Sequence, residues 1–428
     1  MKILENKEYR KRIIDSTIET YLTVSGGVCI EGPKWCGKTW ASAYHSASEF
    51  LVGDPADDFS NRKLASLQPK GVLKGDTPRL IDEWQEVPEL WDAVRMEIDS
   101  RNRKGQFILT GSSTPKRKGI MHSGVGRIVS LRMDTMSLYE TGDSSGLISL
   151  EDVCNGNLEM TLTGEVSLEN LATFIVRGGW PANLAVSQEK AYLMPRLYMR
   201  TILKEDLNRD EEEGEYDPHR AQLLLSSLAR NESTTVSDCS LLSDITANGK
   251  EEMSRNTLLK YLDRLSRLFL FFNQKPYSPS LRSSLRVKMA EKRHFSDPAM
   301  SAALLGITQE KLMKDLNTFG FLFEALVEHD LRVYAGSFEG ELFHYQDYRN
   351  NEIDAVIELP DGEWCAFEIK LGAKKIDEGA ASLLRVSEDI RRSGGKPPKV
   401  LCVICGLTNA AYVRPDGVFV VPLTALKN

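Results

Sequence analysis

The residues with the clearest chemical pattern occupy positions 32–39, where the chain reads GPKWCGKT after an apolar run at 28–30. The glycines let backbone N–H groups turn inward, and the helix expected next has an N-terminus that favours anions. In this spacing the lysine reaches the β- and γ-phosphates of a nucleotide, and the threonine hydroxyl holds Mg²⁺. The pattern predicts a site for ATP and Mg²⁺ made by Gly32, Pro33, Lys34, Trp35, Cys36, Gly37, Lys38 and Thr39.

Two acids, Asp82 and Glu83, follow a second short apolar run. We expect Asp82 to bind Mg²⁺ at the end of a strand and Glu83 to polarise the attacking water, because phosphoryl transfer depends on a positioned nucleophile. The same acids could instead cap the helix expected at 88–99. Their position downstream of the phosphate loop favours the catalytic interpretation.

Two more polar residues are candidates for the same site. Ser112, with Thr110 and Ser113 beside it, follows a strand-like run at 107–110 and can sense the γ-phosphate, since ligands lie at the carboxyl ends of parallel strands. A simple Gly-Ser turn is the alternative. Arg127 precedes another apolar segment and can stabilise transition-state charge in its own subunit or a neighbour's, or be an ordinary surface residue. Action on a neighbour would require a homo-oligomer such as a ring.

A second group of chemically suggestive residues lies near the C-terminus. Glu368 and Lys370 are two apart in a strand-like run, so both side chains project to one face. Asp354 lies in the preceding strand-like run and Glu324 in a helical one. Carboxylates from neighbouring elements can hold Mg²⁺ for phosphodiester hydrolysis, with the lysine steadying the developing charge. Alternating charges on an exposed strand are the alternative.

The elements needed to position these residues indicate a multidomain α/β protein. Strand and helix patterns alternate around the phosphate loop in residues 1–135, which we interpret as a P-loop core. A helical segment follows at 136–205, and an acidic linker separates it from residues 218–305. There, helical patterns at 221–229 and 254–265, a polar segment at 234–245 between them, and a strand at 268–272 predict a winged helix-turn-helix.

Basic residues gather in and after that region. A cluster on the predicted helix and the following loop could contact DNA phosphates without sequence specificity. The alternative is that these residues form an ordinary solvated surface. The candidate DNA contacts are Arg255, Lys260, Arg282, Arg286, Lys288, Lys292 and Arg293.

Residues 312–428 read as helix, three strands, helix and strand, which is the element order of a restriction-endonuclease-like α/β domain. The expected helices are 316–334 and 377–392, and the expected strands of this order are 341–345, 352–357, 364–370 and 399–405. A further strand at 418–421 closes the domain. This order would bring the C-terminal carboxylates together at one site.

Bulk composition sets the wider limits. The chain has 428 residues, 41% of them hydrophobic and 27% charged, as in a globular protein of several domains. Its first twenty residues are charged throughout and no apolar run approaches a bilayer span, so we expect a cytoplasmic protein with no membrane partner. The net charge of −7 argues against nucleic acid coating the whole surface but allows a local basic face. The C-x-x-C at 402–405 lies in an apolar run and indicates buried thiols rather than a metal site.

The chain resembles the prokaryotic AAA+-type ATPases that carry a C-terminal DUF4143 domain. The matching pieces include GPKWCGKT, LIDEWQEVPELWDAVR, ILTGSS, RGGWP, FGFLFEALVEHDL, EIDAVIE, FEIK and RPDGVFVVPL, in the family's order. The resemblance implies an AAA+-like core, a small helical lid at 136–205, a winged helix and an endonuclease-like tail. It departs from the family in the bulky Trp35-Cys36 of the phosphate loop.

These observations favour an ATPase that acts on DNA as a motor or switch. Two alternatives stay open: a nucleotide-gated switch that controls a protein partner, and an ATP-gated, Mg²⁺-dependent nuclease.

Overall fold

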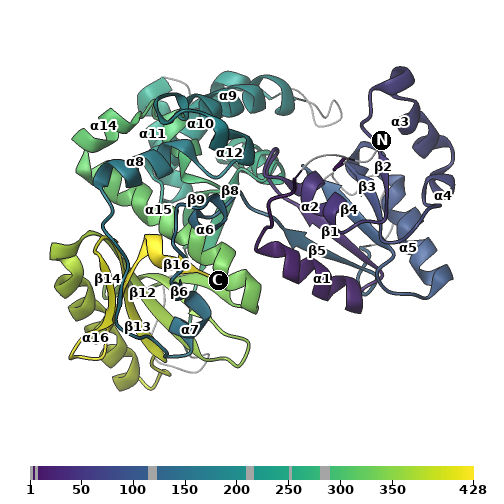
Figure 1. Ribbon diagram of the computed structural model, residues 1–428. Helices are drawn as coiled ribbons and strands as arrows, with labels where there is room; N and C mark the ends of the chain where they lie inside the picture. The colour runs from purple at the N-terminus through teal and green to yellow at the C-terminus, as the bar shows by residue number, and fades with distance from the viewer. Residues whose placement is uncertain (1–2, 5–7, 114–122, 209–215, 250–252, 280–289) are drawn as a thin grey trace. The chain divides into compact units, whose positions relative to one another are not determined.

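The computed structural model describes residues 3–4, 8–113, 123–208, 216–249, 253–279 and 290–428 (Figure 1). The chain forms two compact units, one from residues 1–135 with 267–269 and one from the remainder. Each unit has its own sheet and its own core, and each is described separately.

The first unit is built on a parallel five-stranded sheet with the order β2-β3-β4-β1-β5 among the described residues. Parallel strands need crossover connections, and helices supply most of them. The strands are β1 (Gly27–Glu31), β2 (Ser48–Leu51), β3 (Arg79–Asp82), β4 (Phe107–Gly111) and β5 (Ile128–Arg132). The helices are α1 (Ile14–Val24), α2 (Lys38–Tyr44), α3 (Ala56–Leu67), α4 (Pro69–Val72) and α5 (Glu89–Arg101).

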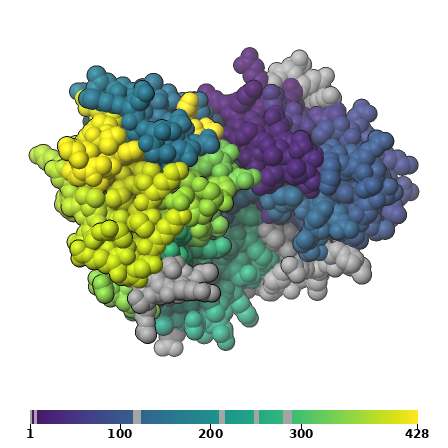
Figure 2. Space-filling view, turned by 90° about the horizontal axis from the view of Figure 1, so that it is seen from below, coloured from purple at the N-terminus to yellow at the C-terminus, as the bar shows by residue number. Residues whose placement is uncertain are grey.

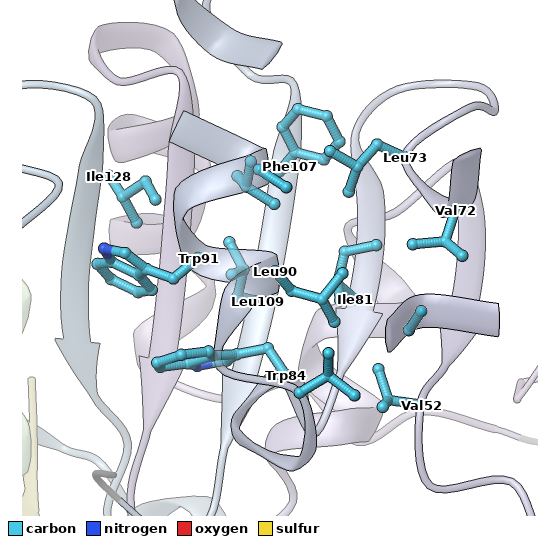
Figure 3. Close-up of a cluster of buried hydrophobic side chains, with 14 of the residues drawn as sticks. Val52, Val72, Leu73, Ile81, Trp84, Leu90, Trp91, Phe107, Leu109 and Ile128 are labelled. Carbon is cyan, nitrogen blue, oxygen red and sulfur yellow. The ribbon is translucent and has the colours of Figure 1, made fainter. Parts of the chain in front are cut away.

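Both faces of this sheet are buried, which explains why its central strands read as continuous apolar runs. Cys29 and Leu109 contribute to a core that includes side chains of α3, α4 and α5. Val28 and Ile108 contribute to the opposite core, with side chains of α1 and α2. Figure 3 shows the first of these cores, where Trp84 and Trp91 have ring centroids 4.8 Å apart.

The second unit begins with a largely helical part that leads into a hairpin. The hairpin strands β8 (Phe271–Pro276) and β9 (Lys292–Phe295) are antiparallel. The strand expected at 268–272 therefore starts later, and Phe269 has a positive φ of 55°. The helices are α8 (Leu168–Arg177), α9 (Leu193–Thr201), α10 (Pro218–Arg230), α11 (Asp238–Gly249), α12 (Arg255–Arg267), α13 (Pro298–Leu304) and α14 (Gln309–Lys314).

A turn at Gly178 and Gly179 brings the end of α8 close to the backbone of Met136 and to Asp297. A Cβ on Gly179 would meet the carbonyl oxygen of Met136 at 2.1 Å, so only glycine fits there. Its N–H donates to Asp297 at 2.9 Å, and its carbonyl accepts the N–H of Met136 at 2.7 Å. The paired glycines thus fix a close backbone approach.

The C-terminal part carries most of a mixed sheet with the order β7-β14-β15-β13-β12-β11-β10-β8-β9 among the described residues. Helix α16 packs on one face through apolar side chains such as Leu383 and Val386. The further elements are α15 (Leu316–Ala335), β10 (Glu341–Gln346), β11 (Glu352–Glu358), β12 (Trp364–Gly372), α16 (Ile376–Arg392), β13 (Val400–Leu407), β14 (Ala410–Val413) and β15 (Phe419–Pro422).

An earlier segment of the chain completes the C-terminal sheets. β7 (Thr161–Leu162) pairs with β14, and β6 (Ile148–Ser149) pairs with β16 (Leu426–Lys427). The short helices α6 (Leu138–Thr141) and α7 (Leu150–Cys154) belong to the same segment. Figure 2 shows it in blue beside the yellow C-terminal residues. Residues 136–165 are therefore integral to the C-terminal part of the second unit.

Candidate functional site

The phosphate loop connects β1 to α2, as the motif predicts. Gly32 and Gly37 have φ of 154° and 107°, and Trp35 adopts φ of 64° and is 58% exposed. Lys38 is buried, and its ammonium donates to the carbonyl oxygens of Gly32 and Pro33 at 2.9 and 2.7 Å. The lysine charge is thus held inside the loop whose N–H groups would face phosphates.

A residue outside the motif supports the loop from behind. The buried guanidinium of Arg12 donates to the carbonyl oxygens of Cys36 and Asp134 at 2.7 and 2.9 Å. Its backbone N–H donates to Asp15, which also lies 3.0 Å from His45. Arg12 ties the loop to the chain beyond β5. Sequence reasoning missed it because a single arginine in a charged N-terminal segment carries no local signal.

Asp82 and Thr110, at the carboxyl ends of the neighbouring strands β3 and β4, meet Thr39 of helix α2. Asp82 Oδ1 accepts hydrogen bonds from the hydroxyls of Thr39 at 2.9 Å and Thr110 at 2.6 Å. Burial raises the pKa of Asp82, and the two hydroxyl contacts lower it in part. A carboxylate and a hydroxyl held this close can serve as ligands for a hard cation beside a phosphate.

Glu83 follows Asp82, and hydrogen bonds hold both its backbone and its side chain in place. Its φ is 55°, and its N–H donates to the Thr110 hydroxyl at 3.0 Å. Its Oε2 accepts from the hydroxyl of Ser112 at 2.9 Å and from the side-chain amide of Gln85. Ser112 thus contacts Glu83, and Gln85 is a partner that sequence reasoning missed. The sequence feature that could have indicated Gln85 is a polar residue in the segment between Trp84 and Val87.

Arg127 is the one catalytic candidate placed away from this group. Gly27 pairs with Ile128, so Arg127 lies at the amino end of the parallel strands, and the phosphate loop follows their carboxyl ends. Its guanidinium pairs with Asp99 at 2.9 Å. The structure does not bring Arg127 to the site of its own chain, which corrects that version of the prediction and leaves two interpretations, action on a neighbouring subunit or an ordinary surface arginine.

Comparison with known families agrees with the geometry. Residues 25–142 match the family model described as an AAA domain, and residues 319–426 match the domain of unknown function DUF4143. The chain thus carries an AAA-type P-loop ATPase domain and a C-terminal DUF4143 domain. Residues 168–311 of this ATPase match a third family model, the domain of unknown function DUF8612, which sequence reasoning did not identify.

Individual relatives of the ATPase are distant. It is 23% identical over 351 residues to the uncharacterised proteins Mb2031c of Mycobacterium bovis and Rv2008c of Mycobacterium tuberculosis, covering 80% of this chain and 70% of each relative. Among solved structures, the Walker-type ATPase PABY2304 of Pyrococcus abyssi is 14% identical with a TM-score of 0.42, covering 69% of this chain and 96% of that one. The signal-transduction ATPase PH0952 of Pyrococcus horikoshii, which has a tetratricopeptide repeat sensor, is 13% identical with a TM-score of 0.20, covering 76% and 48%.

A Gly32→Ala substitution should damage the loop directly. The new Cβ would meet the carbonyl oxygen of Met133 at 2.1 Å, and φ of 154° is strained for alanine. We expect a loss of about 1–3 kcal/mol in the stability of the first unit and weaker ATP binding. Thermal unfolding and equilibrium binding measure both effects. Gly53→Ala is the matched control, since a Cβ there meets nothing within 4 Å; equal behaviour of the two variants would contradict this account.

The candidate DNA contacts of the ATPase fall into different environments. Arg255 and Lys260 are exposed on α12, and Arg255 lies 3.5 Å from Asp238. Arg293 also pairs with Asp238, at 2.7 Å. Lys292 is buried and ion-paired, so its prediction as a phosphate contact is corrected: strand pairing turns this side chain into the protein. Three further candidates lie outside the described residues: Arg282, Arg286 and Lys288.

The four C-terminal candidates lie close together in the DUF4143 domain, in a neighbourhood formed by Glu324, Asp354, Glu368 and Lys370. Glu368 Oε1 accepts from Lys370 at 2.8 Å, and Asp354 Oδ2 accepts the N–H of Ile369 at 2.8 Å. Burial raises the pKa of Glu368 to about 8 and that of Glu324 to about 7. Yet no group of three His, Cys, Asp or Glu side chains in the described part of the chain is arranged to hold a metal ion. The Mg²⁺ expected here does not fit these carboxylates as placed.

A buried acid, Glu232, adjoins this neighbourhood through His294. Glu232 Oε1 lies 3.2 Å from His294 Nδ1, and its carboxylate accepts from the hydroxyl of Ser301 and the N–H of Phe295. Burial raises the pKa of Glu232 to about 8 and holds that of His294 well below its usual range. At neutral pH this site contains a protonated acid and a neutral imidazole.

The raised pKa of Glu232 makes the stability of the second unit depend on pH. The folded chain keeps the proton up to about pH 8, whereas the unfolded chain releases it near 4.5, so stability falls as pH rises between these values. Glu232→Gln should flatten the fall in unfolding free energy by up to about 1.4 kcal/mol per pH unit. Urea unfolding at several pH values between 5.5 and 7.5 measures the slope; parallel slopes for wild type and variant would disprove the assignment.

Two remaining expectations concern the C-x-x-C cysteines and membrane-spanning segments. Cys402 and Cys405 are buried free thiols on β13, as expected from their apolar surroundings. In the described ranges, none of the helices combines the length and apolar character needed to cross a membrane.

Proposed function

We propose that this ATPase uses ATP hydrolysis to act on DNA. The proposed action on DNA rests on one observation, the order of the elements between residues 218 and 295. Helices α10, α11 and α12 are followed by the β8–β9 hairpin, and a winged helix-turn-helix has the same order. Arg255 and Lys260 are exposed on α12, the helix that would approach the phosphates. Such contacts supply affinity that does not depend on sequence.

The ATP site supports hydrolysis as the source of energy. Thr39 and Asp82 would hold Mg²⁺, which neutralises phosphate charge when bound. Lys38 would contact the phosphates, and Glu83 would orient the attacking water. Ser112 and Gln85 both contact the Glu83 carboxylate, so they set the direction in which it points.

The C-terminal part fits the proposal as a second DNA-facing module. Helix α15, three antiparallel strands β10–β12, helix α16 and the parallel strand β13 follow in the order of a restriction-endonuclease-like core. We propose that it recognises DNA shape. The sequence-based domain division is 1–135, 136–205, 218–305 and 312–428, and we revise it by joining residues 136–165 to the last domain, because β6 and β7 pair with its strands. We also propose that Arg127 completes a neighbour's site in a homo-oligomeric ring.

ATPase activity measured with single-stranded, duplex and branched DNA tests the proposal. We expect at least one DNA structure to raise the rate, with Lys38→Ala as the inactive reference. Arg255→Ala/Lys260→Ala should weaken DNA binding and reduce the magnitude of the salt slope by about one per lost phosphate contact. Arg103→Ala/Lys104→Ala removes a matched exposed pair from the first unit.

A rate that ignores every DNA structure, with no salt-dependent DNA binding, would rule the proposal out. A nucleotide-gated switch for a protein partner would then be favoured, as the net charge of −7 allows.

A further inference from the structure

Lys292 reaches from β9 into the C-terminal group of acids. Its ammonium lies 2.5 Å from Glu324 Oε1 and 2.9 Å from Glu328 Oε1, and it donates to the carbonyl oxygen of Asp354 at 3.1 Å. An ammonium has three N–H donors. All three have an acceptor here, so Lys292 is fully satisfied by one helix and one strand of the C-terminal part.

This contact is largely buried, most deeply on the side of Glu328. The side chains of Lys292, Glu324 and Glu328 are 10%, 18% and 1% exposed. Burial opposes the charge on Lys292, but the facing carboxylates outweigh it and raise its pKa. The lysine is therefore a cation at neutral pH, and breaking a buried pair of this kind costs about 3–5 kcal/mol.

The other acids of the group are also engaged. Asp354 accepts a backbone N–H, and one oxygen of Glu368 accepts from Lys370. The second oxygen, Glu368 Oε2, is buried and has no hydrogen-bond partner among the residues that the structure describes. Four carboxyl groups thus share two lysines, and a divalent cation could reach the oxygens of Glu324 and Glu328 only if the position between them were open.

We propose that Lys292 is the resident cation of this carboxylate group, defined as Glu324, Glu328, Asp354 and Glu368. Its ammonium fills the position that a divalent cation would need, so the wild-type group is metal-free and latent as a cation site. The C-terminal domain then acts as a binding module and not as a Mg²⁺-dependent nuclease. This inference does not depend on the proposed action of the ATPase on DNA.

Strand pairing explains why the lysine would prevail over a free ion. Lys292 pairs with Gln274 across the hairpin, and β8 pairs with β10 of the C-terminal sheet. The ammonium is thus delivered by the same backbone that forms the sheet, at a high effective concentration. A free divalent cation must instead displace it and also be stripped of water.

Mn²⁺ binding to the nucleotide-free full chain tests this inference, with bound Mn²⁺ counted by electron paramagnetic resonance. Asp82→Asn is included in every chain to remove the cation site beside the phosphate loop. The parent chain, which carries only Asp82→Asn, should bind no more Mn²⁺ than the same chain with Glu324→Gln added. Lys292→Met should gain a bound Mn²⁺ that is lost again when Glu324→Gln is added, and Lys292→Arg should behave like the parent.

Two results would overturn the inference. One is Mn²⁺ bound by the parent and lost with Glu324→Gln or Glu368→Gln, and this comparison decides even if Lys292→Met fails to fold. The other is a folded Lys292→Met chain that gains no Mn²⁺. Plasmid nicking by the wild type in Mg²⁺, abolished by Glu368→Gln, would count against it equally.

Discussion

A Glu83→Gln chain is expected to bind ATP with unchanged affinity and to hydrolyse it about 10²–10⁴-fold more slowly. The amide keeps the shape of the side chain but cannot take up a proton or orient water as a carboxylate does. The neighbouring contacts should survive, because the Ser112 hydroxyl can donate to an amide oxygen as well as to the carboxylate that it now contacts at 2.9 Å. Single-turnover hydrolysis separates this chemical step from nucleotide binding.

The matched control for that experiment is Glu86→Gln, the same substitution on the same short turn and outside the ATP site. We expect it to leave turnover near the wild-type rate. Equal rates for wild type and Glu83→Gln would show that Glu83 does not act in the chemical step. A loss of ATP affinity in Glu83→Gln would instead point to a role in binding.

Lys38→Ala is expected to weaken ATP binding by roughly 10–100-fold, the loss of one charge-assisted contact of about 1.5–3 kcal/mol. Hydrolysis should fall further, because the charge on the transferred phosphoryl group would lose its nearest lysine. The fold should persist, since the ammonium donates to carbonyl oxygens of its own loop. Equilibrium nucleotide binding and circular dichroism together measure this pattern.

Lys74→Ala is the control for Lys38→Ala, because Lys74 is exposed on the same unit. Wild-type affinity in Lys38→Ala would contradict the assignment of the loop. A loss of helical signal would show that Lys38 supports the fold of the loop as well as phosphate binding.

Much of the ATP site could be predicted because its signal is local. The glycines, Lys38 and Thr39 lie within eight residues, and Asp82 ends a short apolar strand. Parallel pairing then brings Thr110 beside Asp82. Arg12 could not be predicted in the same way, because its partners Cys36 and Asp134 are distant in sequence.

The error at Lys292 has the same physical origin. Lys292 lies in a mainly basic stretch of the sequence, so local reasoning placed it on a loop as a DNA phosphate contact, whereas β9 turns it toward Glu324 and Glu328. The two-residue strands β6 and β7 were likewise beyond prediction, since they are too short to show periodicity and form only by pairing with distant partners.

Those two short strands have a consequence for how the protein can be divided. A fragment cut at residues 319–426, the bounds of the DUF4143 match, would lack β6 and β7 and half of β16, and would expose the outer edge of β14. Unpaired edges promote aggregation. The chain leaving the P-loop unit at residue 135 also enters the C-terminal fold before it enters residues 168–311. Along the chain that leaves at residue 135, mechanical displacement of the P-loop unit would therefore reach the last domain of the sequence before it reached residues 168–311.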